Sequence, residues 1–267
     1  MNDEILFGSS EMSARQKYYM VPISKARQQI IDSCKKCDAG FIEVKEKINS
    51  VEDLAIDRAV ECECRRKAHL IEKRIESGIP RQFQSMAIDA RLNINVSAKE
   101  TIDFYIEKID EVYKKGLCIL IVTDKFIFAR QAAGIKILLN AINKGYSAHY
   151  IDMNRYFDFK TKHFRDDGIN VDDFINEVEA TDFLCIDNIG NIVSTEYVRN
   201  TFTSMMSERI SQCLPTVLIT SLNSFDDYLG SNFVNLFQPV TTIANIDNSY
   251  DEQNGFVNLK RRLSGKM

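Results

Sequence analysis

Residues 118–153 read CILIVTDKFIFARQAAGIKILLNAINKGYSAHYIDM. The stretch opens within an apolar run at 117–122 and closes on a second apolar run at 147–153, while residues 126–143 have the pattern of a long helix. We therefore predict a strand, a helix and a second strand. Nucleotide-binding proteins place a glycine-rich phosphate loop between such a strand and such a helix. Here the connecting residues, TDKFIFAR at 123–130, contain no glycine.

The same alternation of apolar runs and helical patterns continues to about residue 246. Residues 97–116 carry apolar side chains with a 3.6-residue period and end at Gly116, which predicts one helix. Strands that are apolar throughout and alternate with helices are typical of a parallel sheet buried on both faces. The predicted fold class is therefore α/β, a mostly parallel sheet with helices on both faces. Beyond residue 153 the predicted strands are 182–188, 215–221 and 240–246, and the predicted helices are 171–180, 194–212, 224–230 and 232–237.

The first eighty residues differ in character from the rest. They are rich in charge and mostly helical in pattern, and Ser50 is a candidate N-cap for a helix through SVEDLAIDRAVEC at 50–62. A glycine and a proline in SGIPRQF, at 77–83, then stop the helix and turn the chain. We therefore predict two domains, a small and mostly helical N-terminal domain at 1–80 and an α/β domain at 81–267.

Four of the seven cysteines cluster in the N-terminal domain, at Cys34, Cys37, Cys62 and Cys64. CKKCDAG is a half-site of the zinc-knuckle type, and CEC follows after a spacer of 24 residues. We predict a structural Zn²⁺ held by these four thiolates, with no open position for catalysis. In one unbroken helix Cys62 and Cys64 would point about 200° apart, so zinc requires a break in the helix at 60–64. The alternative is a set of free cysteines on a charged helix.

Composition and charge limit the classes of partner. The chain is 45% hydrophobic and 27% charged, as expected for a globular protein with a core. Its apolar runs are too short to cross a membrane and no secretory signal is visible, so we expect a cytoplasmic protein without a membrane partner. A net charge of −4 argues against overall attraction to nucleic acid. The basic runs at 64–74 and 259–267 could contact nucleic acid locally or be solvated surface, and the signal for single-stranded DNA is weak.

Three segments resemble DnaC/DnaI-type helicase loaders of bacteria and phages, to which the IstB transposition helpers are related. They are ESGIPRQF at 76–83, NAINKGYSAHYIDMNRYFD at 140–158, and the run from ATDFLCIDN to VLITS at 180–221. The resemblance spans roughly residues 30–245 and is strongest at 181–221. It implies an AAA+ domain with a P-loop-like fold, preceded by a small region that binds the hexameric replicative DNA helicase. Many phage members carry a cysteine-pair motif in that region.

The resemblance places a GxxxxGK[ST] phosphate loop at 123–130, and the chain departs from it. FIF at 126–128 stands where glycines and small residues belong. Such side chains would block the phosphate cavity and supply none of its charge. The simpler interpretation is that a helix begins here, with Thr123 as its N-cap and Asp124 in its first turn.

Other ATPase parts implied by the resemblance are altered as well. Asp187 matches the Walker B aspartate and is the one candidate cofactor-binding residue, but Asn188 replaces the second acid. Asn223 is displaced by one position at the end of the sensor strand. Residues 210–260 contain no arginine, so the arginine finger that the resemblance implies is missing as well. Because phosphoryl transfer depends on positioning and electrostatics, we expect neither ATP as a cofactor nor ATP hydrolysis.

We therefore interpret the chain as a phage-like DNA replication protein that resembles a helicase loader and binds the replicative helicase without ATP hydrolysis. Three alternatives remain open. The first is an active ATPase loader with an unorthodox site that uses Lys125 or Arg130. The second is an inhibitor or decoy of helicase loading, and the third is an IstB-like transposition helper.

Overall fold

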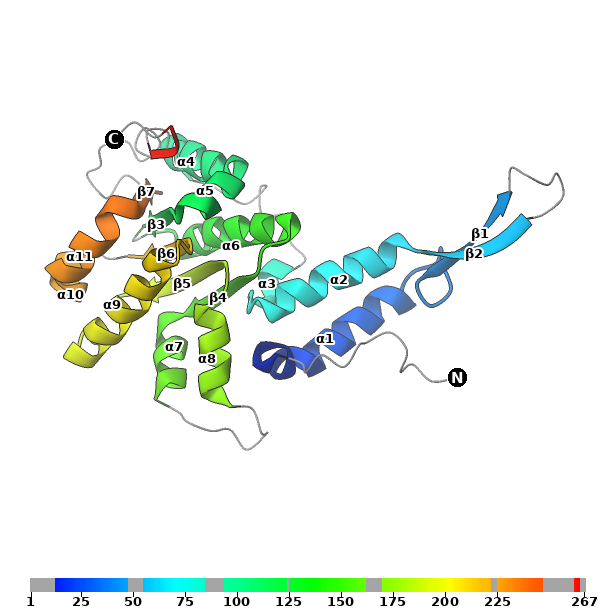
Figure 1. The fold of residues 1–267 in the computed structure, drawn as a ribbon, viewed down its shortest axis with the longest axis horizontal. Coiled ribbons are helices and arrows are strands. Elements are labelled where there is room, and N and C mark those ends of the chain that lie inside the picture. Colours follow the sequence, from blue (N-terminus) through cyan, green and yellow to red (C-terminus); the bar gives the residue numbers. More distant parts are fainter. Residues whose placement is uncertain are drawn as a thin grey trace.

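The computed structural model describes residues 13–47, 55–84, 94–123, 125–161, 170–221, 225–246 and 262–264. Figure 1 shows an arm of two helices that projects from a body in which helices surround a sheet. We call the described residues between 13 and 79 the arm, and those from 80 onward the body.

The body is built on five parallel strands in the order β4-β5-β6-β3-β7. Almost all strand residues are buried, which confirms the predicted parallel sheet and explains why its strands are apolar throughout. The strands are β3 Cys118–Val122, β4 Ala148–Asp152, β5 Phe183–Ile189, β6 Thr216–Thr220 and β7 Thr241–Asn245.

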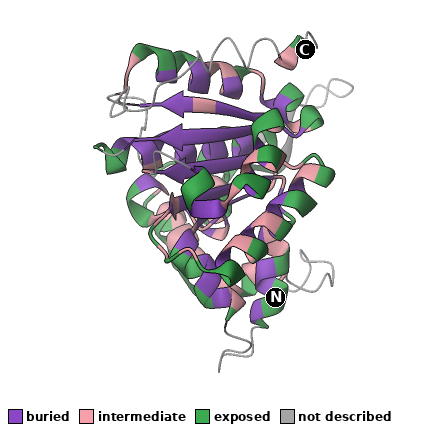
Figure 2. Cartoon of the chain, turned by 90° about the vertical axis from the view of Figure 1, so that its left-hand side faces the viewer, coloured by how far each residue is buried: buried purple, intermediate pink, exposed green. Residues whose placement is uncertain are grey.

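Helices cover both faces of the sheet, as predicted. In the central strand β3, Ile119 and Ile121 join the core on one face, while Leu120 and Val122 join the core on the other. Figure 2 shows buried strands behind helices whose outer sides are exposed. The first face is covered by α3 Arg81–Gln84, α4 Val96–Glu107, α5 Ile109–Lys115 and α6 Ile127–Lys144; the second by α7 Met153–Lys160, α8 Val171–Glu179, α9 Glu196–Ser211, α10 Phe225–Leu229, α11 Ser231–Phe237 and the 3-10 turn η3 Gln238–Val240.

The helices of the body differ from the prediction in some details. The single helix predicted at 97–116 is two helices, because the backbone of Lys108 leaves the helical region with φ −98° and ψ 25°. Gly116 closes the second helix as predicted, in the left-handed conformation with φ 61°. Helix α7 is absent from the prediction. It begins directly after β4, where Asp152 accepts hydrogen bonds from the first backbone N–H groups.

The arm consists of two helices and an antiparallel ribbon, with bounds α1 Ala14–Asp32, β1 Phe41–Lys47, β2 Ala55–Glu61 and α2 Glu63–Glu76. This confirms a mostly helical N-terminal region. The helical interpretation of SVEDLAIDRAVEC is wrong, because its described part at 55–61 is a strand. AIDRAVE pairs with FIEVKEK in an antiparallel register, so that Ile42 lies opposite Val60 and Val44 opposite Arg58. Cross-strand pairing outweighs the local helical pattern here.

The arm is attached to the body at one edge of the sheet. Backbone N–H groups of Ala14 and Arg15 donate to the two carboxylate oxygens of Glu177 on α8, at 2.6 and 2.9 Å. A carboxylate at a helix N-terminus is favourable because the first N–H groups have no partner within the helix. The backbone N–H of Tyr150 on edge strand β4 donates to the carbonyl of Ser77 at 2.7 Å. The end of α2 therefore covers part of this sheet edge.

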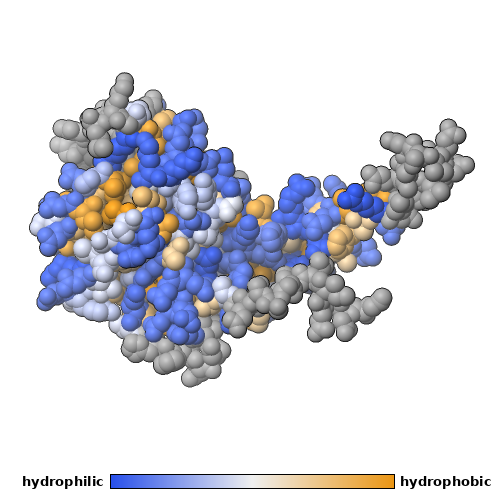
Figure 3. Space-filling model, in the orientation of Figure 1, coloured by the Kyte–Doolittle hydropathy of each residue, from blue (hydrophilic) through white to orange (hydrophobic). Residues whose placement is uncertain are grey.

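Apolar side chains are exposed at the far end of the arm and at one edge of the body. On the ribbon they include Ile42, Val44 and Val60, and Figure 3 shows apolar surface near this end of the arm. On the body they are Val96, Phe126, Ile127, Phe128, Val193 and Tyr197, which lie close to the carboxyl ends of strands. Within the described residues, no helix has both the length and the apolar composition of a membrane span.

Candidate functional site

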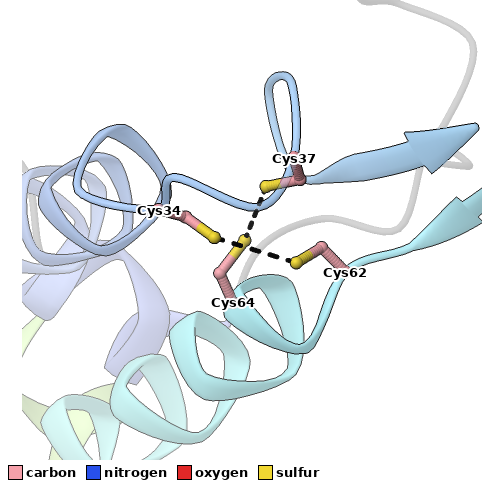
Figure 4. A group of neighbouring side chains, drawn as sticks. All are labelled: Cys34, Cys37, Cys62 and Cys64. Carbon is pink, nitrogen blue, oxygen red and sulfur yellow. Dashed lines mark hydrogen bonds between the residues drawn. The ribbon is translucent and has the colours of Figure 1, made fainter.

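The four clustered cysteines come together where the two helices of the arm meet the ribbon. Cys34 and Cys37 lie in the connection from α1 to β1, and Cys62 and Cys64 lie at the start of α2. Their four Sγ atoms lie within 4.8 Å of one another. Figure 4 shows sulfur contacts between the two segments, at 3.8 Å for Cys34 and Cys62 and 3.4 Å for Cys37 and Cys64. The structure thus brings together the four residues singled out as zinc ligands.

The break that zinc requires at 60–64 is present. Strand β2 ends at Glu61, Cys62 is the N-cap of α2 with an extended backbone (ψ 152°), and the helix begins at Glu63. Cys64 therefore lies in the first helical turn. This change of backbone from strand to helix lets the two side chains approach one point, which one continuous helix would prevent.

A tight turn holds the first cysteine pair against α2. Asp38 and Phe41 exchange backbone hydrogen bonds at 3.1 and 2.8 Å, and Cys62 N–H donates to the carbonyl of Gly40 at 2.8 Å. Gly40 has φ 89°, and a Cβ added there would lie 2.6 Å from Cγ of Arg65. Only glycine fits this turn without displacing the arginine.

The geometry and chemistry of the cluster fit Zn²⁺. Four sulfurs about 2.3 Å from a tetrahedral zinc lie about 3.8 Å from one another, and the contacts between the pairs are 3.8 and 3.4 Å. Cys62 and Cys64 are 3% and 6% exposed. A hydrogen bond from the backbone of Lys36, with the thiol of Cys37, lowers the pKa of Cys34 to about 7, whereas burial raises the pKa of Cys37 and of Cys64. At least one ligand is therefore readily deprotonated near neutral pH, as metal binding needs.

The second candidate site is the connection from β3 to α6, where the resemblance places a phosphate loop. The buried Thr123 Oγ1 accepts hydrogen bonds from the backbone N–H groups of Lys125 and Phe126 at 3.2 and 3.3 Å. Helix α6 begins at Ile127, with Phe126 as its N-cap. The prediction that Thr123 is the N-cap is therefore wrong, because its hydroxyl closes a turn that precedes the helix. Asp124 lies outside the described residues.

Apolar side chains stand where a phosphate loop would present backbone N–H groups. Phe126, Ile127 and Phe128 are 46%, 57% and 38% exposed. The ring of Phe128 stacks on Phe83, with 5.1 Å between the ring centroids. This segment offers an apolar surface to solvent in place of a cradle for phosphate.

Arg130 is buried beside this connection and its guanidinium donates to the protein itself. It is 3% exposed, and it donates to the carbonyl of Thr123 at 3.1 Å and to Oδ1 of Asn188 at 2.9 Å. Asn188 in turn donates to Oδ2 of Asp152 at 2.5 Å. Buried polar groups are retained when they find partners. The resulting chain of hydrogen bonds crosses the carboxyl ends of β3, β5 and β4.

Asp187, the candidate Walker B residue, is fully buried and its carboxylate oxygens accept hydrogen bonds from the protein. Oδ2 accepts from the hydroxyl of Tyr150 and from Nε2 of Gln131, the latter at 2.8 Å, and Oδ1 accepts from the backbone N–H of Asn188 at 2.7 Å. Burial, followed by the charge of Asp187, raises the pKa of Tyr150. The phenol therefore stays protonated and donates. Together with the Arg130 contacts, these bonds form what we call the carboxyl-edge network.

Sequence reasoning found part of this network. It identified Asp187 and Asn188 but not Tyr150 or Gln131, and it considered Arg130 only as part of an unorthodox ATPase site. The sequence does contain a sign of these buried polar contacts, because Arg130 and Gln131 are adjacent polar residues at the start of an otherwise apolar helical run. Their partners lie 58 and 56 residues away along the chain, which no local pattern reveals.

Two other predicted positions are only partly described. Asn223, at the sensor position, lies outside the described residues, while the hydroxyl of the preceding Thr220 donates to the carbonyl of Ile189 at 2.7 Å. In the C-terminal basic run, Arg262 donates to the carbonyls of Thr241 and Gln238, the latter at 3.0 Å. This arginine therefore supports the start of β7.

Comparison with known proteins bears on the fold. Neither a protein-family model nor a curated protein matches the sequence. Among solved structures, the chain is similar to the DnaC helicase loader, with a TM-score of 0.53 and 18% identity over 63% of this chain and 100% of that one. It is also similar to DnaI, with a TM-score of 0.52 and 14% identity over 63% of this chain and 94% of that one. The fold expected from the resemblance is thus confirmed, because the chain shares its α/β fold with the DnaC helicase loader and DnaI.

Proposed function

We propose that this protein is a DNA replication protein of the helicase-loader type, which binds the replicative helicase without hydrolysing ATP. The fold that it shares with the DnaC helicase loader and DnaI supports a role in replication. The observation that supports independence from ATP is the carboxyl-edge network. In it Arg130 donates to Thr123 and Asn188, while Asp187 accepts from Gln131 and from the backbone N–H of Asn188.

The network occupies the part of the fold where a nucleotide would bind. In open parallel sheets, ligands bind at the carboxyl ends of the strands. Phosphoryl transfer there requires backbone N–H groups and cations for the phosphates and a carboxylate for Mg²⁺. Here the Arg130 guanidinium donates to protein oxygens, and the Asp187 carboxylate accepts from three protein donors. Recruiting either group to a nucleotide would leave buried partners unsatisfied, which costs about 1–3 kcal/mol for each group.

We assign helicase binding to the N-terminal domain at 1–80, and we regard residues 81–267 as the degenerate AAA+ domain. The arm projects from the body and exposes Ile42, Val44 and Val60 on its ribbon (Figures 1 and 3). A Zn²⁺ bound by the four cysteines would join the ribbon to both helices. Its role would be structural, because four thiolates leave no position for substrate.

The test is binding of the full-length chain to its cognate hexameric helicase, measured by calorimetry with and without Mg²⁺ and ATP. We expect affinities that agree within about twofold, and no heat of nucleotide binding to the chain alone. The double variant I42D/V60D should weaken helicase binding, whereas the matched control V193D, on the body, should not. A complex that forms only with ATP would overturn the proposal.

A loading assay on single-stranded DNA separates a loader from an inhibitor. A loader increases the amount of helicase on a circular single strand, and an inhibitor decreases loading by the host machinery. Fluorescence anisotropy with a labelled oligonucleotide tests single-stranded DNA as a second partner. A 1:1 isotherm with ATP would instead favour an active ATPase that uses Lys125 or Arg130.

A further inference from the structure

The sulfurs of the cysteine cluster make two close contacts between the two segments of the arm. These contacts at 3.8 and 3.4 Å each run from the α1–β1 connection to the start of α2, as Figure 4 shows. The partners are separated by 28 and 27 residues in the chain. A disulfide has an S–S bond of about 2.05 Å, so each pair would have to close by roughly 1.4–1.8 Å.

Each pair also joins a more accessible sulfur to a buried one. Cys34 and Cys37 are half-buried, while Cys62 and Cys64 are buried. An oxidant from solvent reaches the outer cysteine first, and the inner cysteine lies next to it as the resolving thiol. This is the arrangement in which a sulfenic acid is converted to a disulfide before it is oxidised further.

We propose that the cluster is a redox-responsive site in which a peroxide converts the four thiolates into two disulfides, Cys34–Cys62 and Cys37–Cys64. The release of zinc rests on the zinc site proposed above, whereas the disulfide pairing depends neither on zinc nor on helicase binding. Both disulfides join the same two segments that the metal would join. The arm therefore keeps its two helices connected at this point when its metal ligands are oxidised.

The chemistry balances with hydrogen peroxide as the oxidant. The outer thiolate attacks one peroxide oxygen, the O–O bond breaks, and a sulfenic acid and hydroxide form. The inner thiolate then attacks the sulfenyl sulfur, the S–S bond forms, and a second hydroxide leaves. Two electrons pass from the sulfur pair to the peroxide, and two protons convert the hydroxides to water. Two molecules of peroxide thus consume all four thiolates, which frees one bound Zn²⁺.

The experiment uses the full-length, zinc-loaded chain and stepwise addition of hydrogen peroxide. A chromogenic chelator follows zinc release, and peptide mapping without reduction identifies the linked cysteines. We expect complete release after two equivalents of peroxide and peptides linked as Cys34–Cys62 and Cys37–Cys64. The oxidised, metal-free chain should also unfold at a higher temperature than the reduced chain in chelator.

Two variants test the proposed pairing of the cysteines. In C62S, peroxide should give the Cys37–Cys64 link and a sulfenic acid at Cys34 that dimedone traps. The control C213S removes an exposed cysteine outside the cluster and should behave like the wild type. Links within one segment, Cys34–Cys37 or Cys62–Cys64, would overturn the proposal, as would retention of zinc in excess peroxide. A chain purified without zinc would refute the metal assignment alone, because the peptide map still decides the pairing.

Discussion

The two candidate sites differ in how their polar atoms are satisfied. In the cysteine cluster, four side chains of the same kind converge with their sulfurs within 4.8 Å, and such a group is completed by a cation that all four can bind. In the carboxyl-edge network, donors meet acceptors of the protein itself. The Arg130 guanidinium donates to Thr123 and Asn188, although its Nε has no hydrogen-bond partner, and Asp187 accepts from Gln131 and Asn188. This difference is the reason why we propose a metal in the arm and no nucleotide in the body.

Removal of zinc ligands should have the largest effect and tests whether the cysteine cluster of the arm binds a metal. In C62S/C64S the tetrahedral donor set is halved, so we expect zinc to fall from about one ion per chain to below about 0.1, with loss of order in the arm. Elemental analysis and circular dichroism measure the two effects. The matched control C213S should retain its zinc. Wild-type zinc content in the double variant would show that the metal, if bound, lies elsewhere.

Removal of the Arg130 side chain tests whether the network is structural. R130A would leave a cavity and remove the donors to Thr123 and Asn188, so we expect a loss of about 3 kcal/mol in unfolding free energy. Urea unfolding measures it. The control K125A removes an exposed cation nearby and should change stability by less than about 0.5 kcal/mol. If R130A were as stable as the wild type and bound ATP, the Arg130 side chain would be blocking a nucleotide site and would not be needed for stability.

A smaller effect is expected when one hydrogen bond to Asp187 is removed. Y150F deletes a buried donor to a carboxylate, which should cost about 1.5–2 kcal/mol in the same unfolding experiment. Tyr146 is a matched control because its hydroxyl also donates to a carboxylate, that of Asp110 at 2.9 Å, but on the exposed surface. Y146F should cost less than about 1 kcal/mol. Equal losses of stability in Y150F and Y146F would mean that the buried hydrogen bond to Asp187 contributes no more than an exposed one.

The two sites also differ in how far they could be predicted from sequence. The strand–helix–strand run at 118–153 was predictable because short apolar runs and a helical period are local patterns that burial preserves. The cysteine cluster was predictable because its chemistry depends on residue type and spacing. The strand at 55–61 was not, because its charged residues suit a helix until β1 pairs with them. The burial of Arg130 was not predictable either, since it depends on Asn188, 58 residues later.

The smallest predicted effect is a pH dependence at the junction of arm and body. His149 on β4 is buried there, near Arg15 of α1, Glu76 of α2 and Arg155 of α7. Burial, followed by the charge of Arg15, lowers the pKa of His149 well below 6.5. As pH falls below about 6.5, the unfolded chain binds a proton here that the folded chain does not, so stability falls.

The loss between pH 7 and 5.5 should be about 1 kcal/mol in unfolding free energy. Burial raises the pKa of Glu76, which acts in the opposite direction as pH falls, so the two contributions must be separated by mutation. H149L should flatten the pH dependence relative to the wild type, while the control H69L, at an exposed histidine on α2, should leave it unchanged. If H149L kept the wild-type slope, the acid sensitivity would arise elsewhere. A flattened slope would show that the acid sensitivity of stability arises at His149. This residue lies where α1, α2 and α7 meet the edge strand β4, and the arm is attached to the body at this contact.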